Sequence, residues 1–76
     1  MDATRLVQMA NQIAAFFAAY PKDKAVAATR DHFLRFWDPR MREDLVRLIR
    51  SGPNGLSEIA LAAAFQLAAS PSKEAR

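Results

Sequence analysis

Hydrophobic residues in the first third of the chain recur at steps of three and four residues, the spacing of one face of a helix. These residues are Leu6, Met9, Ile13, Phe16, Phe17 and Tyr20. Asp2 is a suitable N-cap, and Pro21 disfavours helical geometry at the residue before it. We therefore expect a first helix from about Ala3 to Ala19 with this face inward. Its other face is small and uncharged, and it consists of Val7, Ala10, Asn11, Ala14, Ala15 and Ala18.

The middle of the chain predicts two helices joined by a tight corner. The second helix should run from near Asp23 to near Trp37. Its apolar stripe is formed by Val26, Thr29, Phe33, Phe36 and Trp37. Asp38 followed by Pro39 is typical of a helix start, because aspartate caps well and proline at the first helical position loses no needed hydrogen bond. A third helix is expected from Pro39 to about Arg50, with Met41, Leu45, Leu48 and Ile49 inward.

Residues 51–55, Ser-Gly-Pro-Asn-Gly, form a loop by composition. Ser57 is then a good N-cap for a fourth, alanine-rich helix from Glu58 to about Ala69, which includes Ile59, Leu61, Phe65 and Leu67. No segment shows the alternation of a strand. The predicted fold class is all-α, a compact bundle of three to four short helices. Residues 1–69 are expected to form one domain, and residues 70–76 a flexible C-terminal tail.

The charged residues are unevenly distributed along the chain. The protein has 11 Lys and Arg and 8 Asp and Glu, yet Leu6–Pro21 and Ile59–Ser72 contain none of them. A surface helix normally carries charge on its exposed side, so a helix without any charge must be covered on more than one face. A chain of 76 residues can cover little of itself. This pattern favours a small helical piece that sits against a larger protein.

Composition limits the possible chemistry. The chain has no cysteine, and a single histidine, His32, cannot build a metal site alone. We interpret His32 as an exposed residue on the polar side of the second helix, and we predict no catalytic or metal-binding residues. The net charge of +3 is only mildly basic, and Glu43 and Asp44 lie among the arginines of the third helix, which disfavours nucleic-acid binding. No apolar run is long enough for a membrane span, so we expect a cytoplasmic protein.

Two groups of residues are candidates for binding a partner protein. The corner from Trp37 to Arg42 combines an aromatic side chain with arginines, which are common interface anchors, although helix capping alone also explains Asp38 and Pro39. Asn11 and Gln12 are amides where an exposed helix would carry charge, and amides are buried at a lower cost than charges. The residues predicted to bind a partner are Asn11, Gln12, Phe17, Trp37, Asp38, Pro39, Arg40 and Arg42.

The segments Arg5–Phe17 and Asp31–Arg42 resemble the two signature stretches of the delta subunit of NAD-dependent formate dehydrogenase. The likeness extends from about Arg5 to Leu67 and includes Gly55-Leu56 at the start of the last helix. It implies a small subunit of a soluble, molybdenum- or tungsten-dependent enzyme that oxidises formate to carbon dioxide. It also implies that the metal cofactor, iron–sulfur clusters, FMN and NAD are bound by larger subunits, and that this chain binds no cofactor.

The sequence and the resemblance together predict a non-catalytic accessory subunit. It should dock on the catalytic (alpha) subunit of the complex and stabilise it or help to assemble it, without binding nucleic acid or a membrane. One alternative is a transient chaperone for insertion of the molybdenum cofactor, absent from the finished enzyme. A second alternative, from another functional class, is a small helical nucleic-acid-binding domain.

Overall fold

Four helices make up most of the chain in the computed structural model, which describes residues 2–52 and 54–69. They are α1 (Ala3–Phe17), α2 (Lys22–Phe36), α3 (Pro39–Arg50) and α4 (Glu58–Ala69). The described residues contain no strand, and the prediction of an all-α bundle is confirmed. The tail predicted for residues 70–76 lies outside the described residues.

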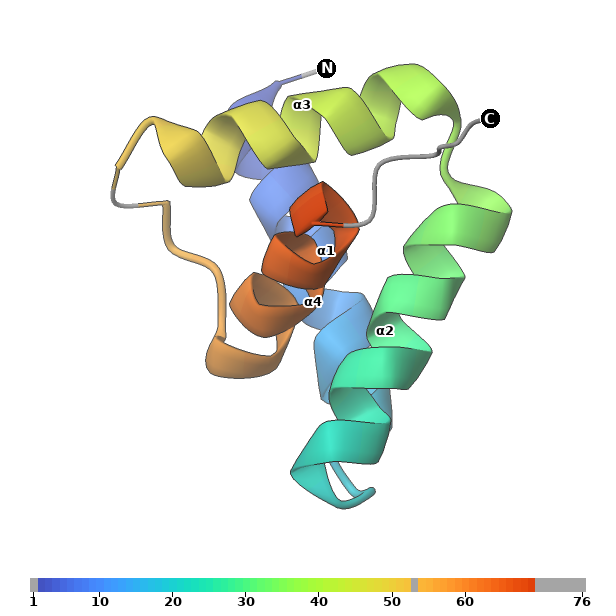
Figure 1. Ribbon diagram of the computed structural model, residues 1–76. Helices are drawn as coiled ribbons and strands as arrows, with labels where there is room; N and C mark the ends of the chain where they lie inside the picture. The colour runs from blue at the N-terminus through green and yellow to red at the C-terminus, as the bar shows by residue number, and fades with distance from the viewer. Residues whose placement is uncertain (1, 53, 70–76) are drawn as a thin grey trace.

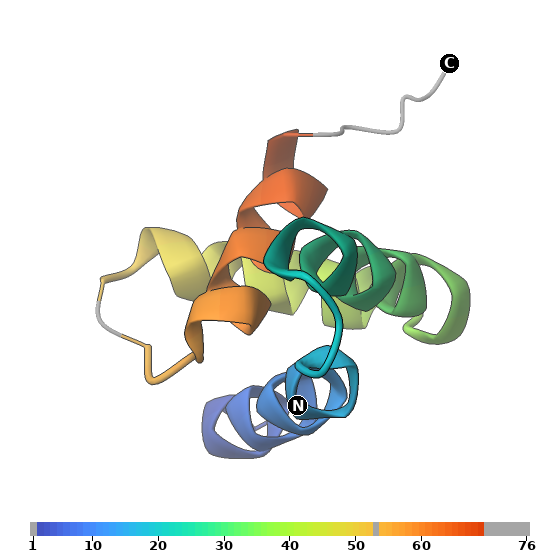
Figure 2. The same ribbon diagram turned by 90° about the horizontal axis from the view of Figure 1, so that it is seen from below.

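The last helix, α4, is the centre of the bundle. It packs against each of the other three helices, with α1 behind it, α3 across the top and α2 at the right in Figure 1. The view from below shows α1 lying alongside both α4 and α2, with α3 behind α4 (Figure 2). Its buried residues are Ala60, Ala63, Ala64 and Leu67. Alanine lets neighbouring backbones approach closely, and a helix covered by three others leaves little surface for charge. After Glu58 in its first turn α4 carries no charge, and its packing against three helices accounts for this.

Local capping by side chains fixes where α1, α3 and α4 begin. The Thr4 N–H donates to the Asp2 carboxylate at 3.3 Å, and the Met41 N–H donates to the Asp38 carboxylate at 2.9 Å. The Ala60 N–H donates to the Ser57 hydroxyl at 3.3 Å. Each side-chain oxygen satisfies a backbone donor that has no partner within its helix. The predicted ranges of α3 and α4 are confirmed, and α2 lies one residue earlier than predicted at each end.

The first helix ends two residues earlier than predicted. The Ala18 N–H donates to the Ala15 carbonyl at 3.2 Å, and the Tyr20 N–H donates to the Phe17 carbonyl at 3.0 Å. These bonds span three residues, so the chain tightens into turns before Pro21 instead of continuing as α-helix.

The buried side of α1 differs from the prediction. Leu6, Ala10 and Ala14, four residues apart, are its buried residues. The predicted core residues Phe16 and Tyr20 are instead 77% and 55% exposed. The physical reason is the close packing against α2 and α4, which the small alanine side chains permit and large aromatic ones would prevent. Met9 and Ile13 lie at the edge of this contact and are half-buried against the core.

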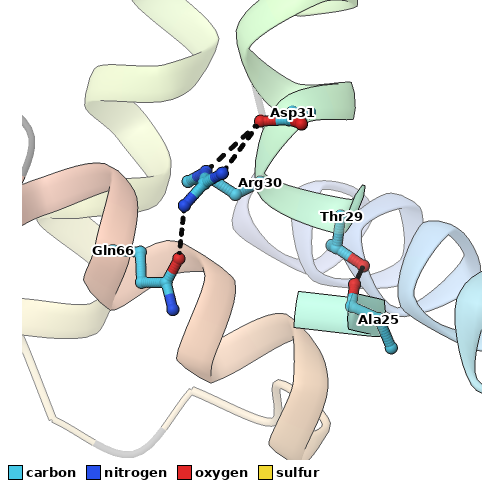
Figure 3. A network of polar contacts seen from close by, with 5 residues as sticks. All are labelled: Ala25, Thr29, Arg30, Asp31 and Gln66. Atoms are coloured by element: carbon cyan, nitrogen blue, oxygen red, sulfur yellow. Dashed lines mark hydrogen bonds and ion pairs between the residues drawn. The ribbon is translucent and has the colours of Figure 1, made fainter. Parts of the chain in front are cut away.

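The interface between α2 and α4 also contains polar contacts (Figure 3). The Arg30 guanidinium on α2 donates to the Gln66 side-chain oxygen on α4 at 2.7 Å and to the neighbouring Asp31 carboxylate at 3.1 Å. The buried Thr29 hydroxyl donates to the Ala25 carbonyl at 2.7 Å, so this hydroxyl has a partner inside its own helix. These hydrogen bonds link α2 to α4 and give the buried Thr29 hydroxyl a partner.

Candidate partner-binding surface

Trp37 is part of the hydrophobic core. Its side chain is 5% exposed, and its ring lies 4.4 Å from that of Phe33 in a tilted arrangement. Its backbone N–H donates to the Phe33 carbonyl at 3.1 Å and closes α2. In this fold the indole is not available as a surface anchor, and it fixes the corner between α2 and α3 from within.

Asp38, Pro39 and Arg42 also have structural roles within the chain, and Arg40 is the exception. Asp38 caps α3 and Pro39 is its first residue. The Arg42 guanidinium donates to the Leu34 carbonyl at 2.9 Å, one of the last four carbonyls of α2, which have no partner within the helix. Arg40 is exposed. The capping interpretation of Asp38 and Pro39 thus describes the observed contacts.

Asn11 connects α1 to the loop before α4. Its side-chain nitrogen donates to the Gly55 carbonyl at 3.1 Å, and its side-chain oxygen accepts from the Ser57 N–H at 2.8 Å. The amide thus bonds at both ends to a segment more than 40 residues away in sequence. This contact explains why the position carries an amide, and it positions the start of α4 on α1.

Gln12 and Phe17 lie on the outer side of α1. Gln12 is exposed and Phe17 is half-buried. Gln12 belongs to a surface that we call the uncharged α1 face, and Phe17 borders it. This face continues from α1 into the turns before Pro21, and it is composed of Gln8, Gln12, Ala15, Phe16, Ala19 and Tyr20, all of them exposed. Successive rings contact one another along it: Phe16 and Phe17 meet edge to face at 5.1 Å, and Phe17 and Tyr20 stack at 6.2 Å. Beyond Arg5 in the first turns of α1, this side carries no charge although the bundle leaves it uncovered.

A groove lies between this face and α2, and we call it the aromatic groove. It has a volume of about 300 Å³ and is lined by Gln12, Ile13, Phe16, Phe17 and His32. His32 is half-buried, and its ring lies 4.7 Å from that of Phe36, which is 71% exposed. Two predictions are wrong here. His32 lies in an aromatic surface and not on a purely polar side of α2, and Phe36 points to solvent because Phe33 and Trp37 already fill the core.

Sequence periodicity alone did not identify this groove, since it placed Phe16 and Phe36 inside. The signal that could have found it is the absence of charge between Arg5 and Lys22. Within residues 2–52 and 54–69, no group of three His, Asp or Glu residues is arranged to hold a metal ion. In the same part of the chain no helix is long and apolar enough to cross a membrane.

Comparison with known proteins identifies the family. The family model described as NADH-dependant formate dehydrogenase delta subunit FdsD matches residues 5–64, most of the chain. No curated protein and no solved structure matches. The matched range includes α1 from Arg5 onward, α2 and α3 in full, and α4 as far as Ala64. The chain therefore belongs to the family of NADH-dependent formate dehydrogenase delta subunits.

Proposed function

We propose that this chain is a non-catalytic accessory subunit that docks on the catalytic (alpha) subunit of a soluble NAD-dependent formate dehydrogenase. The observation that carries the proposal is the uncharged α1 face. Its phenylalanine and tyrosine rings are exposed in the isolated chain, although no charged residue between Arg5 and Lys22 keeps that side in water. The bundle accounts for the missing charge of α4 but leaves that of α1 without an internal cause.

The size of the surface fits a docking role. A standard protein interface takes roughly 800 Å² from each partner, which is about a sixth of the 4840 Å² exposed by this chain. One helix face and its neighbouring groove are a suitable fraction of the exposed surface for such an interface. Burial of a fully exposed phenylalanine contributes about 1.5–3 kcal/mol, so Phe16 and Phe36, at 77% and 71% exposure, are the strongest candidates for anchors.

The proposal assigns the redox chemistry to the partner subunits. Iron–sulfur clusters in proteins are held mainly by cysteine thiolates, and this chain has no cysteine. The polar groups beside the aromatic groove are the amide of Gln12 and the imidazole of His32, which do not make a ligand set for a molybdenum or tungsten cofactor. The chain acts in this account by contact: it covers apolar surface of the large subunit and stabilises the complex.

Co-expression with the catalytic subunit tests the proposal. An affinity tag on this chain should recover the catalytic subunit in a one-to-one ratio, with formate-dependent reduction of NAD in the purified complex. Recovery of active enzyme with far less than one copy of this chain would favour the transient chaperone. Failure to recover the large subunit would contradict the proposal.

Thermal unfolding gives an independent readout of the same proposal. A partner that binds only the folded chain stabilises it by about 2.7 kcal/mol when present at 100 times its dissociation constant. We therefore expect the Tm of this chain to rise when purified catalytic subunit is added, and an unchanged Tm would contradict docking on that subunit.

A further inference from the structure

The aromatic groove has the size and lining of a docking site for side chains. Its walls are Ile13, Phe16 and Phe17, and its polar groups are the Gln12 amide and the His32 imidazole. A volume of about 300 Å³ lies at the lower limit of small-molecule sites. The groove is therefore suited to one or two side chains of a protein partner. Phe36 extends the apolar surface beyond His32, because its ring contacts the imidazole.

The groove is also free of charge. None of its lining residues is Asp, Glu, Lys or Arg. Along the same faces of the two helices, the nearest charged residues are Arg5, two turns before Gln12, and Arg35, one turn after His32, and both are exposed outside the lining. Asp31, the neighbour of His32 in sequence, is already paired with Arg30 at 3.1 Å. A charged partner group in this groove would lose its hydration and meet no opposite charge among the lining residues, which is unfavourable. Electrostatic complementarity therefore selects a neutral occupant.

We propose that the aromatic groove receives an uncharged, apolar segment of the catalytic subunit. This inference rests on the proposed function, because family membership places the chain in a complex with other subunits. A second copy of this chain is the competing occupant, and the experiment separates the two. The specific content of the proposal is that binding depends on the neutrality of the groove and not on matching of opposite charges.

A charge scan at Gln12 tests the neutrality of the occupant. Gln12 is exposed on α1, so Gln12→Glu, Gln12→Lys and Gln12→Met should all keep the fold, as checked by circular dichroism and Tm. Affinity for the purified catalytic subunit is then measured by calorimetry. Both charged variants should raise the Kd by about tenfold or more, since either sign is desolvated without a partner, while Gln12→Met should bind at least as tightly as the wild type.

Two controls match the changes in net charge on a different face. Arg50→Gln and Glu43→Gln alter the charge by −1 and +1 on exposed positions of α3, and neither should change the Kd appreciably. Tight binding by one of the two charged Gln12 variants would reveal an opposite charge in the occupant and overturn the proposal. If no Gln12 variant changes the Kd of a wild type that binds, the groove lies outside the interface, yet the proposed function stands.

A second pair of variants tests the aromatic wall. Phe16→Ser removes an exposed ring of the groove, and Phe65→Ser removes a comparably exposed ring of α4, at 77% and 54% exposure. Phe16→Ser should weaken binding by about tenfold or more, and Phe65→Ser should leave the Kd nearly unchanged. Equal effects of the two would overturn the proposal. So would loss of self-association in Phe16→Ser with unchanged affinity for the catalytic subunit. Failure of the wild type to bind would overturn the proposed function as well.

Discussion

Replacement of Trp37 by alanine should nearly unfold this protein, although an adjacent aromatic residue can be removed at little cost. Trp37 is 5% exposed and packs on Phe33, whereas Phe36 is 71% exposed. Truncation of a buried aromatic residue to alanine costs about 3–5 kcal/mol, and an exposed position usually changes stability by less than about 0.5 kcal/mol. A chain of 76 residues is stabilised by roughly 4–11 kcal/mol in total. Trp37→Ala therefore removes a large fraction of the stability.

Urea denaturation followed by far-ultraviolet circular dichroism measures the difference, because Trp37→Ala removes the only tryptophan and with it the fluorescence signal. Thermal unfolding of the same variant should show a Tm lower by roughly 12–40 °C, at about 4–8 °C per kcal/mol for a domain of this size. Phe36→Ala is the matched control, and Trp37→Phe should give an intermediate loss. A cost below 1 kcal/mol for Trp37→Ala, or equal costs for the two alanine variants, would refute the assignment of Trp37 to the core.

Three further substitutions test the local contacts by urea denaturation. Asn11→Ala should cost about 1–3 kcal/mol, because two hydrogen bonds to the loop before α4 are lost; Asn11→Asp, which keeps the acceptor for the Ser57 N–H, should cost about half as much, and equal costs would argue against the donor bond. Asp38→Ala should cost about 1 kcal/mol by removing the cap of α3, whereas Asp38→Asn should be nearly neutral, and a neutral alanine variant would count against the cap. Gly55→Ala should destabilise by about 1–2 kcal/mol, because φ is +81° there, and an unchanged stability would show that the loop adopts another conformation.

Helix positions could be predicted from the sequence because the signals that set them are local. Asp38 followed by Pro39 fixes the start of α3, and Ser57 fixes that of α4, through contacts within three residues. The one clear error in length, the end of α1, occurs where the chain forms tight turns just before Pro21. Capping chemistry depends on neighbours in sequence, so it can be recognised without the tertiary structure.

The buried side of α1 could not be predicted in the same way. Periodicity favours the side with the large residues, but the structure buries Ala10 and Ala14, because α1 packs closely against other helices at these small positions. This choice depends on which neighbour a helix meets, and the helical pattern of one segment does not contain that information. The same holds for Asn11, whose partners Gly55 and Ser57 are 44 and 46 residues away.

The candidate site was only partly recognisable from the sequence. Gln12 and Phe17, predicted to bind a partner, both line the aromatic groove, and the lack of charge in α1 after Arg5 indicates that helix. Their role in binding stays a prediction. The sequence predicts Phe16 and Phe36 to be buried, since large aromatic residues are usually buried, and it predicts His32 to lie on a polar side of α2. The corner from Trp37 to Arg42 has residue types that are common in interfaces, but most of its side chains make contacts within the chain.

Amide hydrogen exchange of this chain, alone and in complex with the catalytic subunit, tests most directly whether α1 is the docking face. Contact through the uncharged α1 face and the aromatic groove predicts slower exchange in α1 and in the part of α2 around His32, with exchange in α3 nearly unchanged. Protection confined to α3, with α1 exchanging as fast in the complex as in the free chain, would contradict this assignment.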